Sequence, residues 1–171
     1  MPSEIPLSAG PVSHFLVEDH RRLEGLLQSA LSVDGHMDQG MYDRFRAGLL
    51  RHIGMEEKIL LPTVQRLSGG EPLPIGTKLR LDHGAIAALL MLPPTTAIVA
   101  ILRKILEQHN LVEEGPDGLY DICDRVAGPE AEPLVTRLRA APEVSVLPHS
   151  DAPAVRGAVH RALERAGYRL D

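Results

Sequence analysis

Aromatic residues are scarce in this chain of 171 residues, which has three Tyr, two Phe and no Trp. Because 44% of the residues are nevertheless hydrophobic, the core must consist mostly of Leu, Ile, Val and Ala, a composition that suits packing of helix against helix. The lone Cys123 excludes an internal disulfide, and the shortage of thiols disfavours a structural zinc site or an iron-sulfur cluster. The length predicts one domain with a short appendage.

Basic runs and long apolar runs are also missing. No run of Lys and Arg exceeds two residues and the net charge is −5, so we expect neither a nucleic-acid partner nor binding to an anionic membrane. Residues 1–10 lack the features of a secretory signal, and a cytoplasmic location is expected. Residues 84–102 carry no charge, but Pro93-Pro94-Thr95-Thr96 divides them, which predicts two buried helices joined by a tight turn.

The sequence does contain one distinctive pattern of residues, and this pattern occurs twice. An Asp-His pair opens an apolar stripe, and a His-x-x-x-Glu-Glu element follows it farther along the chain. The stripes are Asp19-His20-x-x-Leu23-x-x-Leu26-Leu27 and Asp82-His83-x-x-Ile86-x-x-Leu89-Leu90, and the later elements begin at His52 and His109.

The repeated residue types are metal ligands. A His and a Glu four residues apart on a helix point the same way, and four histidines with two glutamates converging from four helices predict a site for two metal ions. Imidazole and carboxylate together suit iron, manganese or zinc. Two arrangements are compatible with this pattern. Either His20 and His52 bind one ion while His83 and His109 bind the other, or the pairs are exchanged between the two copies of the repeat. The candidate ligands are His20, His52, Glu56, His83, His109 and Glu113.

The other polar residues receive plainer interpretations. A single histidine on an apolar face is usually an ordinary hydrogen-bonded core residue, and that remains the alternative for each candidate. Glu57 and Glu114 are expected to face solvent or, like Asp19 and Asp82, to accept hydrogen bonds from the ligands. We expect surface positions for four further histidines and simple core packing for two tyrosines. These are His14, His36, His149 and His160, and Tyr42 and Tyr120.

Apolar spacing predicts an all-α fold with five helical segments. Pro62 and Gly115-Pro116 are expected to interrupt two helices just beyond their glutamates. The segments span about 11–30, 41–67, 75–91, 95–126 and 153–166. The expected organisation is a lead-in over 1–10, a helical domain over 11–127 and a Pro-rich appendage over 128–171 whose terminal helix packs on the domain or on a second chain. Residues 129–171 are thus the expected surface for a homodimer or a protein partner.

Over about residues 11–127, the order and spacing of these elements resembles the hemerythrin-like (HHE cation-binding) domains. The resemblance implies an up-down-up-down four-helix bundle with two iron ions, bridged by an oxo or hydroxo group and held by the six candidate ligands. Zinc and manganese are the alternatives. The oxygen-carrying members have a fifth histidine where this chain has Ala87, and a carboxylate five residues after the histidine of the fourth helix, which would select Glu114 over Glu113.

This resemblance implies a centre that interacts reversibly with O2, NO, peroxide or iron, in sensing or in iron and redox homeostasis. A binding protein is favoured over an enzyme because no acid-base partner is evident beyond the ligands. The alternatives are a diiron enzyme of the peroxidase, catalase-like or oxidase type, and an interaction module stapled by a structural metal.

Overall fold

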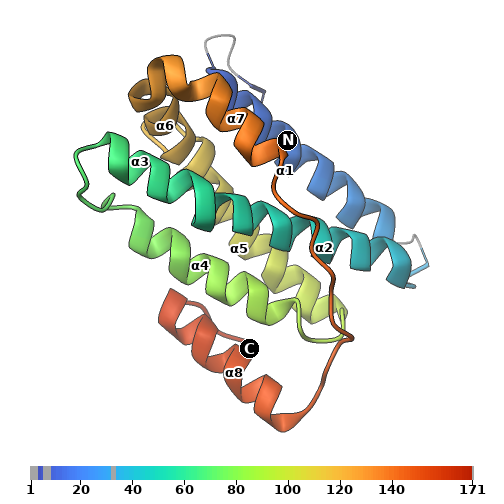
Figure 1. Cartoon of the computed structure of the whole chain (residues 1–171). Helices are drawn as coiled ribbons and strands as arrows, with labels where there is room; N and C mark the ends of the chain where they lie inside the picture. The colour runs from blue at the N-terminus through green and yellow to red at the C-terminus, as the bar shows by residue number, and fades with distance from the viewer. Residues whose placement is uncertain (1–3, 6–8, 32–33, 171) are drawn as a thin grey trace. The chain divides into compact units, whose positions relative to one another are not determined.

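The structure is a computed structural model in which residues 4–5, 9–31 and 34–170 are described. Within these residues the chain is helical, and β-pairing is confined to one isolated antiparallel bridge between Leu31 and Met37 (Figure 1). The elements are α1 (Pro11–Ala30), α2 (Gln39–Met55), the π-helical segment η1 (Glu56–Leu60), α3 (Leu61–Leu67), α4 (Gly76–Leu89), α5 (Thr96–Glu114), α6 (Leu119–Ala127), the 3-10 segment η2 (Gly128–Glu130), α7 (Ala131–Arg139) and α8 (Pro153–Ala166).

The helices form two compact units. Unit 1 comprises Met1–Leu73 and Val112–Val146, and unit 2 comprises Pro74–Leu111 and Leu147–Asp171. Unit 1 therefore contains α1, α2, α3, α6, α7 and the last residues of α5, whereas unit 2 contains α4, α8 and the rest of α5.

In unit 1, α1 lies against α2, and α6 and α7 also pack on α1 (Figure 1). Its core contains fully buried apolar side chains from these helices, which follow helical spacing on each of them. Arg51 of α2 fixes the end of α7, since its guanidinium donates to the carbonyl oxygens of Arg139 and Ala141 at 2.9 and 3.0 Å. The core residues include Leu16, Leu27, Tyr42, Phe45, Met55, Leu60, Tyr120 and Leu138.

The start of α1 is capped by a residue far away in the sequence. The Asp124 carboxylate of α6 accepts from the backbone N–H groups of Val12 and Ser13, both at 2.9 Å, and from the Ser13 hydroxyl at 2.6 Å. It supplies what a local N-cap side chain would otherwise supply. Gly10 permits this approach, because a Cβ there would lie 2.3 Å from Asp124 Cγ. The cap fixes α6 against α1.

The helix that contains Glu56 changes its winding at that residue. η1 begins at Glu56, and the Leu61 N–H donates to the Glu56 carbonyl, a bond over five residues instead of four. Pro62 follows at the start of α3 and has no N–H to continue the α-helical pattern. Such π-helical turns occur often at functional sites.

In unit 2, α4 lies beside α8 (Figure 1). Gly167 ends α8 in the left-handed conformation, with φ of 87°, and the Tyr168 N–H bonds back to the Leu163 carbonyl at 2.8 Å. This turn brings the chain end to Lys78, whose ammonium donates to the Ala166 carbonyl at 2.9 Å and lies 4.6 Å from the centre of the Tyr168 ring. The core contains Leu79, Ile86, Leu89, Val159 and Leu163.

The all-α fold predicted from the sequence is confirmed for the described residues, as are the interruption at Gly115-Pro116 and the helix over 153–166. In the other helix the winding changes at Glu56 itself, before the predicted position at Pro62. α4 and α5 are separated by a turn at 90–95, and none of the described helices combines the length and apolarity needed to cross a lipid bilayer. α7 was not predicted. Most of the expected lead-in, residues 1–3 and 6–8, lies outside the described part, and the predicted boundary at residue 128 stays a prediction.

The lone cysteine gives a test of the unit 1 core. Cys123 is fully buried in α6, and burial, followed by the charge of Asp124, raises the pKa of its thiol to about 12. A buried neutral thiol is a poor nucleophile. We expect almost no reaction of the native protein with a disulfide thiol reagent at pH 8, and complete reaction in denaturant. Rapid stoichiometric labelling of the native protein would contradict this packing.

Candidate metal centre

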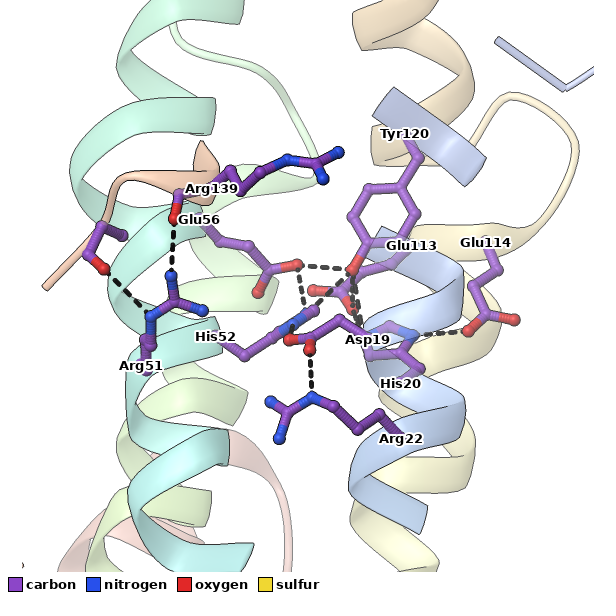
Figure 2. Close-up of polar contacts among 11 residues, drawn as sticks. Asp19, His20, Arg22, Arg51, His52, Glu56, Glu113, Glu114, Tyr120 and Arg139 are labelled. Carbon is purple, nitrogen blue, oxygen red and sulfur yellow. Dashed lines mark hydrogen bonds and ion pairs between the residues drawn. The ribbon is translucent and has the colours of Figure 1, made fainter. Parts of the chain in front are cut away.

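Four of the six candidate ligands come together in unit 1 (Figure 2). Their ligand atoms all lie within 4.8 Å of one another. His20 Nε2 is 3.4 Å from Glu113 Oε2, and His52 Nε2 is 3.2 Å from Glu56 Oε1. Both glutamate side chains are 0% exposed, and the His20 and His52 side chains are only 8% and 2% exposed. A buried set of two imidazoles and two carboxylates at this spacing is able to hold a metal ion.

The helices explain why these side chains face inward. His20 follows Leu16 by four residues and precedes Leu23 by three, so it lies on the buried stripe of α1. His52 and Glu56 are four residues apart at the junction of α2 and η1, and Glu113 lies at the end of α5. Both carboxylates therefore stand where regular α-helix stops.

Tyr120, the second residue of α6, reaches the centre of this group (Figure 2). Its hydroxyl donates to Glu56 Oε1 at 2.6 Å and lies 3.1 Å from Glu113 Oε2. The same oxygen is 3.1 Å from His20 Nε2 and 3.2 Å from His52 Nε2. The phenol of Tyr120 thus contacts all four of the candidate ligands in unit 1.

The outer nitrogen of each imidazole is held by a carboxylate. Asp19 Oδ2 lies 2.7 Å from His52 Nδ1, and Arg22 Nε donates to the other oxygen of Asp19 at 2.8 Å. Glu114 Oε1 lies 2.5 Å from His20 Nδ1. Since each Nδ1 is engaged, each Nε2 is directed at the group, the orientation that a histidine ligand requires.

Electrostatics favour positive charge at this position. Burial would lower the pKa of His52, but the carboxylates of Glu56 and Asp19 raise it to about 10. Burial and the charge of His52 would likewise lower the pKa of His20, yet Glu113 and Glu114 leave it raised. Burial raises the pKa of Tyr120 well above its usual value, and Glu113 and Glu56 add to the effect. Without a metal, protons on the imidazoles offset the negative charge of the buried carboxylates. A bound metal cation would take the place of these protons.

Unit 2 contains the other two candidates, His83 of α4 and His109 of α5. Their ring centres are 4.7 Å apart, and both residues are 3% exposed. Asp82 Oδ2 lies 3.2 Å from His109 Nδ1, and Lys78 Nζ donates to Asp82 Oδ1 at 2.5 Å. Burial would raise the pKa of Asp82, but His109 and Lys78 hold it below its usual value.

The two copies of the repeat thus build similar arrangements. In each, the aspartate of the Asp-His pair binds Nδ1 of the histidine from the later element, and a basic side chain binds the aspartate. The ring centres of His20 and His52 are 4.5 Å apart, close to the 4.7 Å in unit 2. The basic residue differs: Arg22 follows its aspartate by three residues, whereas Lys78 precedes its own by four.

These contacts test several sequence interpretations. The expected hydrogen bonds of Asp19, Asp82 and Glu114 to histidines are confirmed. The interpretation of Tyr120 as simple core packing is wrong, because its hydroxyl lies among the candidate ligands; Tyr42 does pack in the core, beside Phe45. Among the described residues, the four remaining histidines belong to no group with metal-binding spacing.

Comparisons of the chain with protein-family models, with curated proteins and with solved structures found no match. Similarity to the hemerythrin-like domains therefore rests on the residues and their spacing alone. The donor set itself is compatible with a first-row transition metal.

The turn between Glu113 and Tyr120 depends on Gly118. A Cβ at Gly118 would lie 2.6 to 2.7 Å from three carbonyl oxygens, those of Val112, Glu113 and Gly115. We expect Gly118→Ala to destabilise the protein by about 1–3 kcal/mol, measured by denaturant unfolding. Gly25→Ala is the matched control, because nothing lies within 4 Å of a Cβ there and alanine favours the helix by about 0.5–1 kcal/mol. Equal effects of both changes would contradict the close packing of this turn.

Proposed function

We propose that this protein is a hemerythrin-like iron-binding protein with two metal ions in a four-helix bundle. Its ligands are the six candidates: His20, His52, Glu56, His83, His109 and Glu113. The observation that carries the proposal is the repeated arrangement in which a basic side chain holds an aspartate, the aspartate holds a histidine, and the histidine directs Nε2 away from both. Metal-binding histidines are commonly oriented in this manner.

The buried carboxylates give the proposal its energetic basis. Two ionised glutamates with 0% exposure cost several kcal/mol each unless a cation accompanies them. Each imidazole pair has its own aspartate, which favours one ion for each pair. In this proposal Glu56 and Glu113 are the ligands common to both ions.

The proposed role is reversible interaction of the diiron centre with O2, NO, peroxide or iron, in sensing or redox homeostasis. The bound iron would supply electron transfer and open coordination positions. A surface cavity of about 310 Å³ in unit 2 is lined by Ala97, Ile101, Lys104, Ile105, Gly167, Tyr168 and Arg169. None of these is a candidate ligand, so this cavity does not favour an enzyme that brings an organic substrate to the metals.

Metal analysis tests the proposal first. We expect two iron ions per chain after anaerobic loading, and a higher melting temperature than the metal-free protein. An ion at a hundred times its dissociation constant stabilises the folded state by about 2.7 kcal/mol. Glu56→Ala should disturb both ions, since the carboxylate is shared, whereas His20→Ala should weaken mainly one.

His14→Ala is the matched control, because the His14 side chain is 58% exposed and its imidazole lies 3.8 Å from the Glu18 carboxylate. It should bind as much iron as the unmodified protein. Identical melting curves with and without metal, or loss of iron in the control variant alone, would show the buried histidines to be ordinary core residues.

Reaction with O2 tests the role. Ala87 lies one turn after His83 in α4 and is half-buried, so the iron beside it lacks the fifth histidine of the oxygen carriers. We expect the diferrous protein to oxidise in air or react with peroxide rather than form a long-lived oxygenated complex. Ala87→His should slow oxidation by closing that position, if the imidazole fits without overpacking. Ala88→His, on a neighbouring face of the same helix, is the control.

Stopped-flow mixing with O2 measures these rates. A stable adduct of the unmodified protein that returns to the diferrous state on removal of O2 would contradict the expected oxidation and would favour oxygen carriage.

A further inference from the structure

We infer that Tyr120 is a direct ligand of the metal ion held by unit 1. This inference rests on the proposed metal site, and it adds a residue that lies outside both copies of the repeat. The ion would then have two imidazole nitrogens, two carboxylate oxygens and one phenolate oxygen from His20, His52, Glu56, Glu113 and Tyr120.

The five donor atoms have the spacing of ligands around one ion. Ligands at right angles around an ion with bonds of about 2.1 Å lie about 3.0 Å from each other. The Tyr120 oxygen is 2.6 to 3.2 Å from one ligand atom of each of the four other residues. Two edges among those four atoms measure 3.4 and 3.2 Å. This is the spacing of a square pyramid with the phenol oxygen at its apex.

The Tyr120 hydroxyl leaves room for an ion among these donor atoms. A hydroxyl that occupied the ion's own position would lie about 2.1 Å from every donor. The shortest contact of the Tyr120 oxygen is 2.6 Å, and the four donor atoms lie within 4.8 Å of one another. An ion at the base of the pyramid therefore completes the contacts of Tyr120 without displacing it.

Contacts on both sides of Tyr120 in the sequence hold it in place. It lies two residues after Gly118, whose tight turn admits no side chain, and four residues before Asp124, which caps α1. Tyr120 is only 1% exposed. Because the segment of α6 that carries Tyr120 is fixed on both sides, the phenol is preorganised for coordination.

Coordination has a defined chemical balance. The O–H bond of Tyr120 breaks, its oxygen forms a bond to the metal, and the proton is released to solvent. No electron is transferred in this step. Three anionic oxygens around the ion favour the ferric over the ferrous state, as anionic axial ligands do in other iron proteins. Coordination by Tyr120 would therefore make this ion harder to reduce.

The experiment compares iron-loaded full-length protein with Tyr120→Phe. Ferric iron bonded to phenolate gives a visible charge-transfer band and enhances phenolate ring vibrations in resonance Raman spectra. We expect both signals in the unmodified protein and neither in Tyr120→Phe, which should still bind iron through the remaining four residues with at least tenfold lower affinity. Tyr42→Phe is the matched control, a fully buried tyrosine of the same unit that packs beside Phe45; it should keep both signals.

A second measurement needs no variant. Titration of the unmodified protein with Zn²⁺ at pH 7 should produce the ultraviolet difference spectrum of one phenolate per chain. Iron binding without the visible band and without this spectrum would overturn the assignment of Tyr120 while leaving the metal site intact. Signals retained in Tyr120→Phe would also overturn it. Failure of the unmodified protein to bind either metal would defeat the proposed function and this inference together.

Discussion

The structure depends on one electrostatic constraint, the burial of Glu56 and Glu113 where no water reaches either carboxylate. Two such charges are tolerable only beside positive charge. His20 and His52 supply it as protons when no metal is present, which is why the pKa of both imidazoles is raised. Such a buried cluster of charged side chains adds little to the stability of the fold, because apolar side chains of the same volume would be at least as stable. The burial of these charges therefore favours a role in binding a cation.

The same constraint accounts for local features of the fold. Glu56 lies at the first residue of a π-helical segment, and Glu113 lies one residue before the end of α5. At both positions the helix departs from regular winding, so the direction of the carboxylate is set by the break and its following proline or glycine turn. Asp19 and Glu114 then hold the imidazoles from outside. The four candidate ligands of unit 1, Tyr120 and the two outer carboxylates are therefore connected by hydrogen bonds, and the two helix breaks set the positions of the glutamates.

Sequence alone predicted the elements whose signals are periodic or repeated. The helix over 153–166 follows from Pro153 and its apolar spacing, and the six candidate ligands follow from the duplication. α7 was missed because Pro129 and Pro133 suggest irregular structure, although both occupy first-turn positions where a missing N–H costs nothing. Tyr120 was missed for a different reason. It belongs to no repeat, and its direction is set by the turn at Gly118, which no pattern of residues reveals.

The repeat is symmetrical in its histidines and aspartates but not in what surrounds them. In unit 1 a phenol enters the group, and Arg22 supports Asp19 from the same helix. In unit 2 the supporting cation, Lys78, also binds the carbonyl of Ala166 and lies over the ring of Tyr168, at the end of α8. The position of Asp82, and through it the orientation of His109, is therefore tied to the C-terminal segment. The two arrangements of common pattern therefore differ in their outer contacts: unit 1 adds a phenol and Arg22, whereas unit 2 is connected through Lys78 to the C-terminal segment.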